Sequence, residues 1–536
     1  MTVQPWPRDP RITGSVAIAA AWWLLSDHMA VWAPSLITIF GQAASTPPEL
    51  MGLFALGCVL ASFPLARAAR DPRGAWAVLG IAIAARVVLA FVPGGQVQLW
   101  AASAGLAAAL AWFAVTVHAH GRALAPGLGL GWLATTSVSA LGGTWGAGWR
   151  PGAFGGAARA VLATLLLLTA TSITAPAAPP GRRQAWTLMP LALVAGISVV
   201  NAGRASTVDD RWGPSLLVAG CALGVVVAWR APRGLLVRLI AALVALSEVA
   251  ATLYGTTGEV PGSLGRWTLM SFVLAPAALV VLLGEDDHAR PARPGALLGG
   301  AVVWVIGFFA YYAGYDLGYR ADALVVALVG VLGAIAVLCA RRTSTPDPDQ
   351  SDPDQSTPEP DPTGGRVVAA PVVLALVIAA VAVVHDPVSH AEVPATAPEV
   401  SVAAWNVGMG YGADGTFRPE EVADLVGDVD VVLLSEIDRG WLLNGGQDQL
   451  AILARLTGKR LYFAPAADPV WGDAVLTSLP VSDVQGHPLP SYGAVTGAGA
   501  LAVRLDVAGA PVWAGATPLA PPPTPEGGTH HPARHP

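Results

Sequence analysis

Long apolar segments recur along the first two-thirds of this 536-residue chain, and they limit its fold more than any other feature. Each is about 20 residues long, the length at which a helix crosses the hydrocarbon core of a bilayer. Hydrophobic residues make up 54% of the chain and charged residues only 12%, roughly half the charged share of an ordinary soluble protein. The sequence therefore predicts a polytopic α-helical membrane protein.

Hydropathy predicts about thirteen spans. They are 14–40, 49–66, 75–93, 98–117, 126–146, 157–175, 184–202, 213–229, 235–255, 267–284, 296–315, 321–340 and 367–385. Arginine supplies all but one of the 30 basic residues, and alanine, glycine, valine and proline are abundant. That composition is typical of a GC-rich gene and favours a bacterial source.

The positive-inside rule orients these spans. With a cytoplasmic N-terminus, the inner loops carry 15 arginines and the outer loops six. The inner set is Arg8, Arg11, Arg67, Arg70, Arg73, Arg122, Arg182, Arg183, Arg230, Arg233, Arg290, Arg293, Arg341, Arg342 and Arg366. The outer set is Arg150, Arg159, Arg204, Arg211, Arg266 and Arg320. We therefore expect a multi-pass plasma-membrane protein whose C-terminal region, after an odd number of spans, is extracytoplasmic.

Composition divides the chain into five parts. Residues 1–342 form the membrane domain, with about twelve helices. Residues 343–365 are an acidic, proline-rich linker with a repeated DPDQ, which we expect to be disordered because it has little apolar surface to bury. A last transmembrane helix, 366–386, precedes a soluble domain at 398–519 and a disordered Pro/His-rich tail at 520–536.

The soluble region has the pattern of an α/β domain. EVSVAAWNVG (399–408) alternates like a strand, whereas DVVLLSEI (430–437) is apolar throughout and predicts a strand that is buried on both faces. Helical spacing follows each of them, at 417–429 and at 447–458, where Gly458 suits a helix C-cap. Several short strands complete the region.

Polar side chains stand at the ends of both strands. Asn406 ends the first, and Glu436 ends the second, with Asp438 close behind. Neighbouring strands would present Asn406 and Glu436 at one edge of the sheet. Carboxylate and amide oxygens are ligands that Mg²⁺ accepts, with water and phosphate completing its shell. The alternative interpretation is that Glu436 and Asp438 are solvated residues where a strand leaves the sheet.

A family resemblance favours the metal site. The run from WNVGMG through DVDVVLLSEIDRG to WGDAVLTSLPV resembles the first half of the endonuclease/exonuclease/phosphatase superfamily. Asn406 matches the family's asparagine and Glu436 its metal-binding glutamate, with Ser435 where glutamine is usual. The segment 472–477 matches the family's hairpin motif, with Asp473 in place of asparagine.

The resemblance implies a partial four-layer α/β-sandwich and a Mg²⁺- or Mn²⁺-dependent phosphoric ester hydrolase. Glu436 and Asn406 would be the metal ligands, with Asp438 and Asp473 as accessory residues. In the family, the metal polarises the phosphoryl oxygens, and a histidine paired with an aspartate prepares the attacking water. The residues that would do this second task in the present chain are unknown.

The chain departs from the family's second half. No G-D-x-N or S-D-H motif follows Glu436, and residues 517–519 read T-P-L where the family has T-H-L. His530, His531 and His535 lie in a Pro-rich tail that would not hold them rigidly enough for catalysis. We expect a truncated or frame-shifted domain with the first sheet and its helices only. Downstream DNA that encodes neither motif in any frame would contradict this expectation.

The membrane domain holds its own candidates. WAPSLITIFG (32–41) and FFAYYAGYDLGY (308–319) are similar to segments of the Cwh43-like family, which is linked to remodelling of lipid anchors. Asp27 and His28 lie in the first span, while Tyr315 and Asp316 lie at the outer end of another. Because ionisable groups within a bilayer are costly, we expect either a pocket for a lipid headgroup or polar pairing between helices.

Three classes of function remain. The first is a membrane-anchored phosphodiesterase or phosphatase acting outside the membrane on a lipid headgroup or small phosphodiester. The second is a catalytically degenerate member, and the third is a lipid-handling or transport protein with an accessory soluble domain. Residues 386–536 carry 17 acidic and seven basic residues, a formal charge of −10, so nucleic acid is an improbable partner. The sequence sets no oligomeric state.

Overall fold

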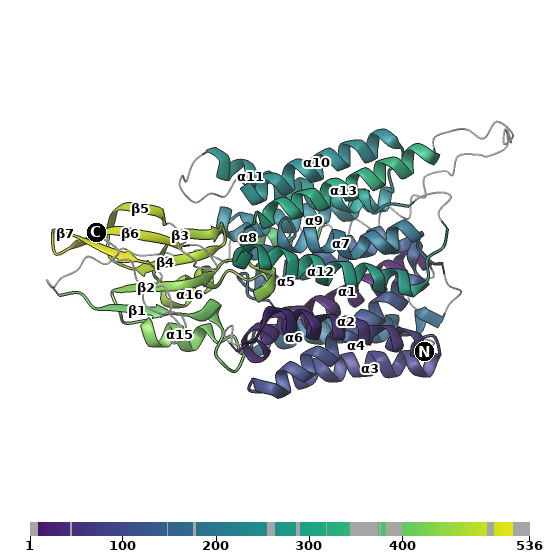
Figure 1. Cartoon of the computed structure of the whole chain (residues 1–536), viewed down its shortest axis with the longest axis horizontal. Helices are drawn as coiled ribbons and strands as arrows, with labels where there is room; N and C mark the ends of the chain where they lie inside the picture. Colours follow the sequence, from purple (N-terminus) through teal and green to yellow (C-terminus); the bar gives the residue numbers. More distant parts are fainter. Residues whose placement is uncertain are drawn as a thin grey trace.

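The computed structural model describes residues 9–42, 46–146, 148–174, 178–254, 263–285, 290–317, 319–343, 373–374, 377–381, 399–489 and 498–517. Figure 1 shows a bundle of long helices that carries a smaller domain of strands and short helices on one end. The N-terminal end of the chain lies toward the opposite end of the bundle.

The bundle consists of helices that run back and forth between these two ends. They are α1 (Pro10–Ser35), which continues as the π-helical turn η1 (Leu36–Phe40), α2 (Pro48–Ala68), α3 (Pro72–Val88), α4 (Gly95–Ala119), α5 (Leu124–Leu141), α6 (Gly152–Ala170), α7 (Arg182–Ile197), α8 (Ala202–Val208), α9 (Gly213–Arg230), α10 (Leu235–Tyr254), α11 (Ser263–Leu282), α12 (Pro294–Leu317) and α13 (Ala321–Thr343).

Local sequence fixes where several of these helices begin. Asp9 precedes Pro10 and accepts a hydrogen bond from the backbone N–H of Arg11 at 2.8 Å. Asp71 precedes Pro72 of α3 and accepts from two backbone N–H groups in the same way. An aspartate cap followed by proline satisfies the free donors of a helix start, because proline lacks the N–H that would need a partner.

The expectation of many long apolar helices is confirmed. Ten helical segments in the described residues are long and apolar enough to cross a membrane. Helix α3, with 17 residues, and the apolar stretch Trp267–Leu282 of α11 are shorter. The thirteenth predicted span, 367–385, is described only at 373–374 and 377–381, and the predicted linker and tail lie outside the described residues apart from Thr343.

The bundle has two halves. In the first, α1 packs against α4, α5 and α6, and α4 also packs against α2 and α3. In the second, α7 packs against α12, while α11 packs against α9 and α10, and α10 against α13. Contacts between α5 and α9 and between α2 and α12 join the halves.

The arginine-rich loops share the end of the bundle away from the small domain. Arg11 donates to the backbone oxygen of Trp229 at 2.7 Å, and the backbone N–H of Arg182 donates to the oxygen of Arg290 at 2.9 Å. These contacts place the start of α1 and three of the predicted inner loops side by side. The loops therefore alternate between the two ends as the hydropathy pattern predicts.

The C-terminal domain contains two sheets. In the first, the strands lie in the order β1 (Val402–Asn406), β2 (Val431–Asp438), β4 (Trp471–Thr477) and β3 (Arg460–Asp468). Strands β1 and β2 are parallel, and the remaining pairs are antiparallel. The second sheet holds β5 (Val481–Leu489), β6 (Ala498–Val507) and β7 (Ala510–Ala516), all antiparallel.

The domain has three layers in its described residues. Helices α15 (Pro419–Val426) and α16 (Gln449–Thr457) cover one face of the first sheet, and the second sheet covers the other. Strand β2 contributes to both cores, with Val432 and Leu434 on the helical side and Val431 on the side of the second sheet. This confirms that β2 is buried on both faces.

The expectation that the domain holds only its first sheet is wrong. Strands β5, β6 and β7 add most of a second sheet, with Leu501, Val503 and Leu505 of β6 packed against the first. The three strands pair in sequence order through antiparallel contacts, so a short stretch of chain suffices to build them. A fourth layer, of helices on the outer face of this sheet, is not present among the described residues.

Candidate functional site

The predicted metal ligands meet at one edge of the first sheet. Asn406 ends β1 and pairs in register with Ser435 of β2, so that Glu436 follows immediately beyond it. A β-bulge interrupts the pairing of β2 with β4 between Leu434 and Ile437. Glu436 lies in this bulge with a φ of 57°, a backbone conformation that residues other than glycine seldom adopt. Such strain re-aims a side chain and is common at functional sites.

Asp473 of β4 joins Glu436 at this edge. Its side chain is buried, hydrogen-bonds to Ser435, and leaves the second carboxylate oxygen without a hydrogen-bond partner. Burial raises the pKa of Asp473 to about 7, and the nearby charge of Glu436 adds to the rise. The two carboxyl groups are therefore close enough to interact.

These residues fit a hard divalent cation. The candidate ligands are the carboxylates of Glu436 and Asp473 and the amide oxygen of Asn406, so all of them are oxygen atoms. The same amide oxygen accepts a hydrogen bond from the backbone N–H of Gly408 at 2.9 Å. No group of three or more His, Cys, Asp and Glu side chains in the described residues could hold a metal ion. The arrangement suits Mg²⁺, which commonly binds through one or two carboxylates and leaves positions for water and phosphate.

Asp438 has a structural role at the end of β2. Only 1% of it is exposed, and one oxygen accepts from the backbone N–H groups of Gly440 and Trp441, both at 2.8 Å. Burial raises its pKa to about 7, although these hydrogen bonds oppose the rise. The interpretation of Asp438 as a solvated residue is wrong, because it holds the turn that leads from β2 into the helical bundle.

The four residues of the predicted headgroup pocket do not form one group. Asp27 of α1 pairs with Arg86 of α3 at 3.6 Å, and the neighbouring His28 hydrogen-bonds through Nε2 to the backbone oxygen of Ala82 at 3.0 Å. Tyr315 belongs to a different cluster at the interface with the C-terminal domain. The side chain of Asp316 lies outside the described residues.

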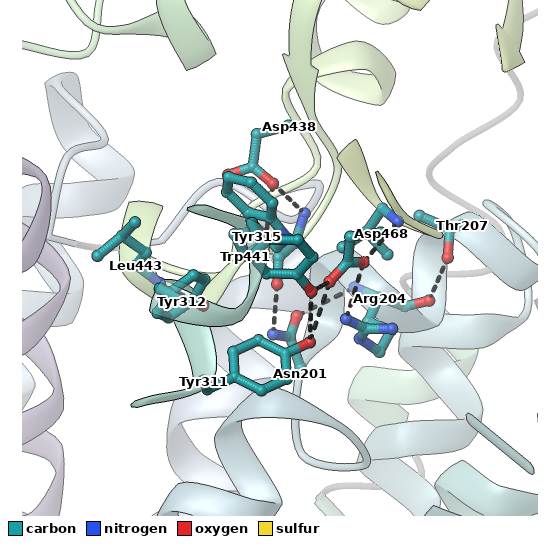
Figure 2. A network of polar contacts seen from close by, with 12 residues as sticks. Asn201, Arg204, Thr207, Tyr311, Tyr312, Tyr315, Asp438, Trp441, Leu443 and Asp468 are labelled. Carbon is teal, nitrogen blue, oxygen red and sulfur yellow. Dashed lines mark hydrogen bonds and ion pairs between the residues drawn. The ribbon is translucent and has the colours of Figure 1, made fainter. Parts of the chain in front are cut away.

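That cluster centres on Asp468, the last residue of β3 (Figure 2). One oxygen lies 3.4 Å from the guanidinium of Arg204 in α8, and the other accepts from the hydroxyls of Tyr311, at 3.0 Å, and Tyr315 in α12. Burial raises the pKa of Asp468, but the attraction of Arg204 and the hydrogen bond from Tyr315 outweigh it and lower the pKa below its usual value. Asp468 is therefore a buried carboxylate whose charge is stabilised by the guanidinium of Arg204.

The segment after β2 enters the same interface. Trp441 stacks on Trp471 with ring centroids 5.5 Å apart and contacts the ring of Tyr315 at 5.2 Å. Its neighbour Gly440 accepts a hydrogen bond at 2.7 Å from the side-chain amide of Asn201, the residue that caps α8. Aromatic packing and buried hydrogen bonds thus dock this segment on the second half of the bundle (Figure 2).

The loop after β1 and helix α16 dock on the first half. Gln98 of α4 donates to the backbone oxygen of Gly415 at 2.7 Å, and the backbone N–H of Gly95 donates to the oxygen of Asp414 at 2.7 Å. The side chain of Arg455 in α16 donates to the backbone oxygen of Gly143. The domain therefore bridges both halves, and the loops that face the bundle are those that follow β1, β2 and β3.

A cavity of about 210 Å³ lies between the halves beneath these loops. Tryptophans from α1, α5 and α12 line it, together with Asp27, Asn201 and the segment Leu442–Gly446 of the C-terminal domain. Gly445 and Gly446 both have positive φ angles, which only glycine adopts without strain, and this lets the backbone approach Ala30 and Asn201 closely. Asp27 thus contributes to a cavity, although His28 and Tyr315 are not among its lining residues.

Sequence reasoning missed the docking residues. In the sequence Arg204 is only a loop charge, and no pattern predicts α8, the short helix that carries it. Asp468 lies in ADPVWG, where no motif distinguishes it from a turn residue. The one usable signal is the tyrosine-rich segment at 308–319, and nothing in the sequence indicates that Asp468 is its partner.

Removing the Asp468 carboxylate will destabilise the docked structure. Asp468→Ala leaves the guanidinium of Arg204, 1% exposed, without its anion, and breaking one side of such a buried pair costs about 3–5 kcal/mol. We expect a lower Tm in detergent and faster proteolytic release of the C-terminal domain. Asp424→Ala, at an exposed position on α15, is the matched control and should behave like the wild type.

The pH dependence of stability will report the state of Asp473. Because its folded pKa is raised, its contribution to stability is complete below about pH 4 and is lost as the pH rises through about 7. In metal-free protein, Asp473→Asn should lower by about one the number of protons taken up on folding between about pH 4 and pH 7. The proton taken up by Asp438 should remain. At pH 8, Mg²⁺ should raise the Tm of the wild type and leave those of Asp473→Asn and Glu436→Gln nearly unchanged. Equal Mg²⁺ responses in all three proteins would contradict a site at this edge.

Comparison with known families agrees with this geometry. Residues 403–535 match the Endonuclease/Exonuclease/phosphatase family. The match covers none of the helical body, so the likeness of that body to the Cwh43-like family stays a prediction. No curated protein matches the chain. The C-terminal region of this protein is therefore a domain of the Endonuclease/Exonuclease/phosphatase family, carried on a body of long apolar helices.

Proposed function

We propose that this protein is a membrane-anchored, metal-dependent phosphodiesterase or phosphatase that acts on the phosphate of a lipid headgroup. The supporting observation is that the loops at the Glu436 edge of the domain rest on the end of the helical bundle. A phosphate in the headgroup layer of the bilayer would lie level with this edge. A small soluble phosphodiester is the second substrate class that the open oxygen-ligand arrangement accepts.

Glu436, Asp473 and Asn406 would hold the metal, Mg²⁺ or Mn²⁺. When bound, such an ion polarises a phosphoryl oxygen and stabilises negative charge as the ester bond breaks. Ser435 orients Asp473 through its hydrogen bond, and the bulge holds Glu436 at the edge of the sheet. Asp438 would act indirectly, by fixing the turn that follows β2.

A catalytically degenerate domain is the main alternative. The observations that favour it are that no group of three or more His, Cys, Asp and Glu side chains in the described residues could hold a metal ion, and that Pro518 stands where the family has a histidine. His530, His531 and His535 lie outside the described residues. In this alternative the domain binds a headgroup without cleaving it.

Transport by the bundle has less support. Many transporters work by rocking one half of a bundle against the other around a central site. Here the C-terminal domain is fixed to both halves, through Arg204 and Asn201 on one side and Gln98 and Gly95 on the other. Such a bridge opposes relative motion of the halves.

Nucleic acid remains an improbable substrate. The region from 386 to 536 has a formal charge of −10, and a nuclease surface should attract phosphates rather than repel them. A duplex would also have to reach an edge whose loops face the helical bundle. Both points favour a substrate that is already in the membrane.

Activity will depend on Glu436. On phosphatidylinositol vesicles or a chromogenic phosphodiester with Mg²⁺, we expect Glu436→Gln to lower kcat/KM by at least about 100-fold, because a direct metal ligand is lost. Asp424→Asn, on the exposed face of α15, should keep wild-type activity. No hydrolysis by the wild type would support the degenerate domain. Lipid movement between leaflets that persists in Glu436→Gln would support transport.

The proposed localisation is the plasma membrane, with the N-terminus cytoplasmic and the C-terminal domain outside. Its support is that the domain sits at the end of the bundle opposite the arginine-rich loops. In a cysteine-free background, a membrane-impermeant maleimide on intact cells should label Leu456→Cys in α16 and spare Arg122→Cys. Both positions are exposed. The reverse labelling pattern would overturn this topology.

A further inference from the structure

The cavity between the two halves of the bundle has the depth of a single leaflet. On α1 its lining runs from Trp22 to Trp32, which at 1.5 Å per residue is about 15 Å. On α12 the lining starts at Ala301, well inside a helix that begins at Pro294. Since a bilayer core is about 30 Å thick, the cavity extends from the middle of the bundle to the end that carries the C-terminal domain.

Its lining changes in character along that depth. The part near the middle of the bundle is apolar, with Leu106, Leu110, Met189 and the rings of Trp132 and Trp304. Toward the domain the lining gains polar groups, because Asp27, Asn201 and the backbone of Gly445 and Gly446 join Trp32 and Leu442 there. A molecule that matches this gradient has an apolar chain and a polar end.

The cavity is covered at its polar end by the segment that follows β2. Leu442 of that segment lies against Gly196 of α7, while Gly445 lies against Ala30 of α1. The segment follows directly on Asp438, the last residue of β2, which is two residues beyond Glu436. The cover of the cavity is therefore continuous in sequence with the edge of the domain that carries Glu436.

We propose that this cavity binds one apolar chain of a phosphate-bearing membrane lipid and so presents the headgroup to the Glu436 edge. The choice of a phosphate-bearing lipid rests on the proposed function, whereas the chain site rests on the cavity itself. Close-packed protein interiors leave few apolar spaces of about 210 Å³, and such spaces bind apolar ligands. The acyl chain of a lipid in one leaflet would fill this cavity and hold the phosphate of the same lipid near the domain.

A photoreactive lipid tests this inference. The full-length protein is reconstituted in nanodiscs of phosphatidylglycerol that contain a small share of the same lipid with a diazirine in mid-chain, and cross-linked residues are mapped by mass spectrometry. We expect cross-links inside the cavity, at Trp132 or Trp304. Cross-links to Trp76 and Trp100, which are exposed on the outside of the bundle, serve as the internal reference.

Two substitutions fill the cavity from opposite halves. Ala301→Phe in α12 and Thr135→Phe in α5 both change lining residues, and each should abolish the internal cross-links while keeping the external ones. Val303→Phe, on the exposed face of α12 and outside the lining, is the matched control and should keep both sets. If one filling variant does not fold, the other variant and the wild-type map still decide the question.

Absence of internal cross-links in the wild type, or their persistence in both filling variants, would overturn the chain site. Glu436→Gln separates this inference from the proposed function. In that variant the internal cross-links should remain while hydrolysis is lost. Internal cross-links in a protein that hydrolyses no phosphodiester would support the chain site and contradict the proposed enzyme.

Discussion

The buried contact of Asp468 with Arg204 and two tyrosine hydroxyls determines how the two parts of this protein fit together. A carboxylate and a guanidinium that are each 1% exposed are unfavourable unless they meet, because neither keeps its water. Asp468 comes from the C-terminal domain and Arg204 from the bundle, so only the docked arrangement pairs them. Trp441 and Trp471 then close the aromatic cluster around this contact.

This docking sets the direction of the sheet edge that carries Asn406, Glu436 and Asp473. Asp468 ends β3 and Asp438 ends β2, so both lie at the same end of the first sheet, which faces the bundle. Glu436 precedes Asp438 by two residues in β2, at a strained bulge in the pairing of β2 with β4. The same loops cover the cavity between the halves. One interface thus brings together a candidate hydrolytic edge and a candidate lipid site.

The sequence predicted those features that depend on local pattern. Apolar windows of about 20 residues predict the helices. The run 431–434 is apolar at every position, whereas a half-exposed strand alternates apolar and polar residues, so it predicts a strand that is buried on both faces. Asn406 and Glu436 were placed at one edge since parallel strands end together. The Asp468–Arg204 contact could not be predicted, because the two residues are 264 positions apart and neither lies in a motif. The prediction of a single sheet is wrong because it rests on the missing G-D-x-N and S-D-H motifs, whereas β5, β6 and β7 pair with one another without them.

The central claim is that the edge of the domain that carries Glu436 rests on the bundle, and a disulfide tests it most directly. A Cβ atom at Gly445 would lie 3.7 Å from that of Ala30, within the range of a disulfide. In a cysteine-free background, Ala30→Cys with Gly445→Cys should cross-link under mild oxidation in native membranes. Ala464→Cys with Gly486→Cys, also 3.7 Å apart but within the domain, is the positive control. A cross-link in the control pair and none between α1 and the domain would contradict the account.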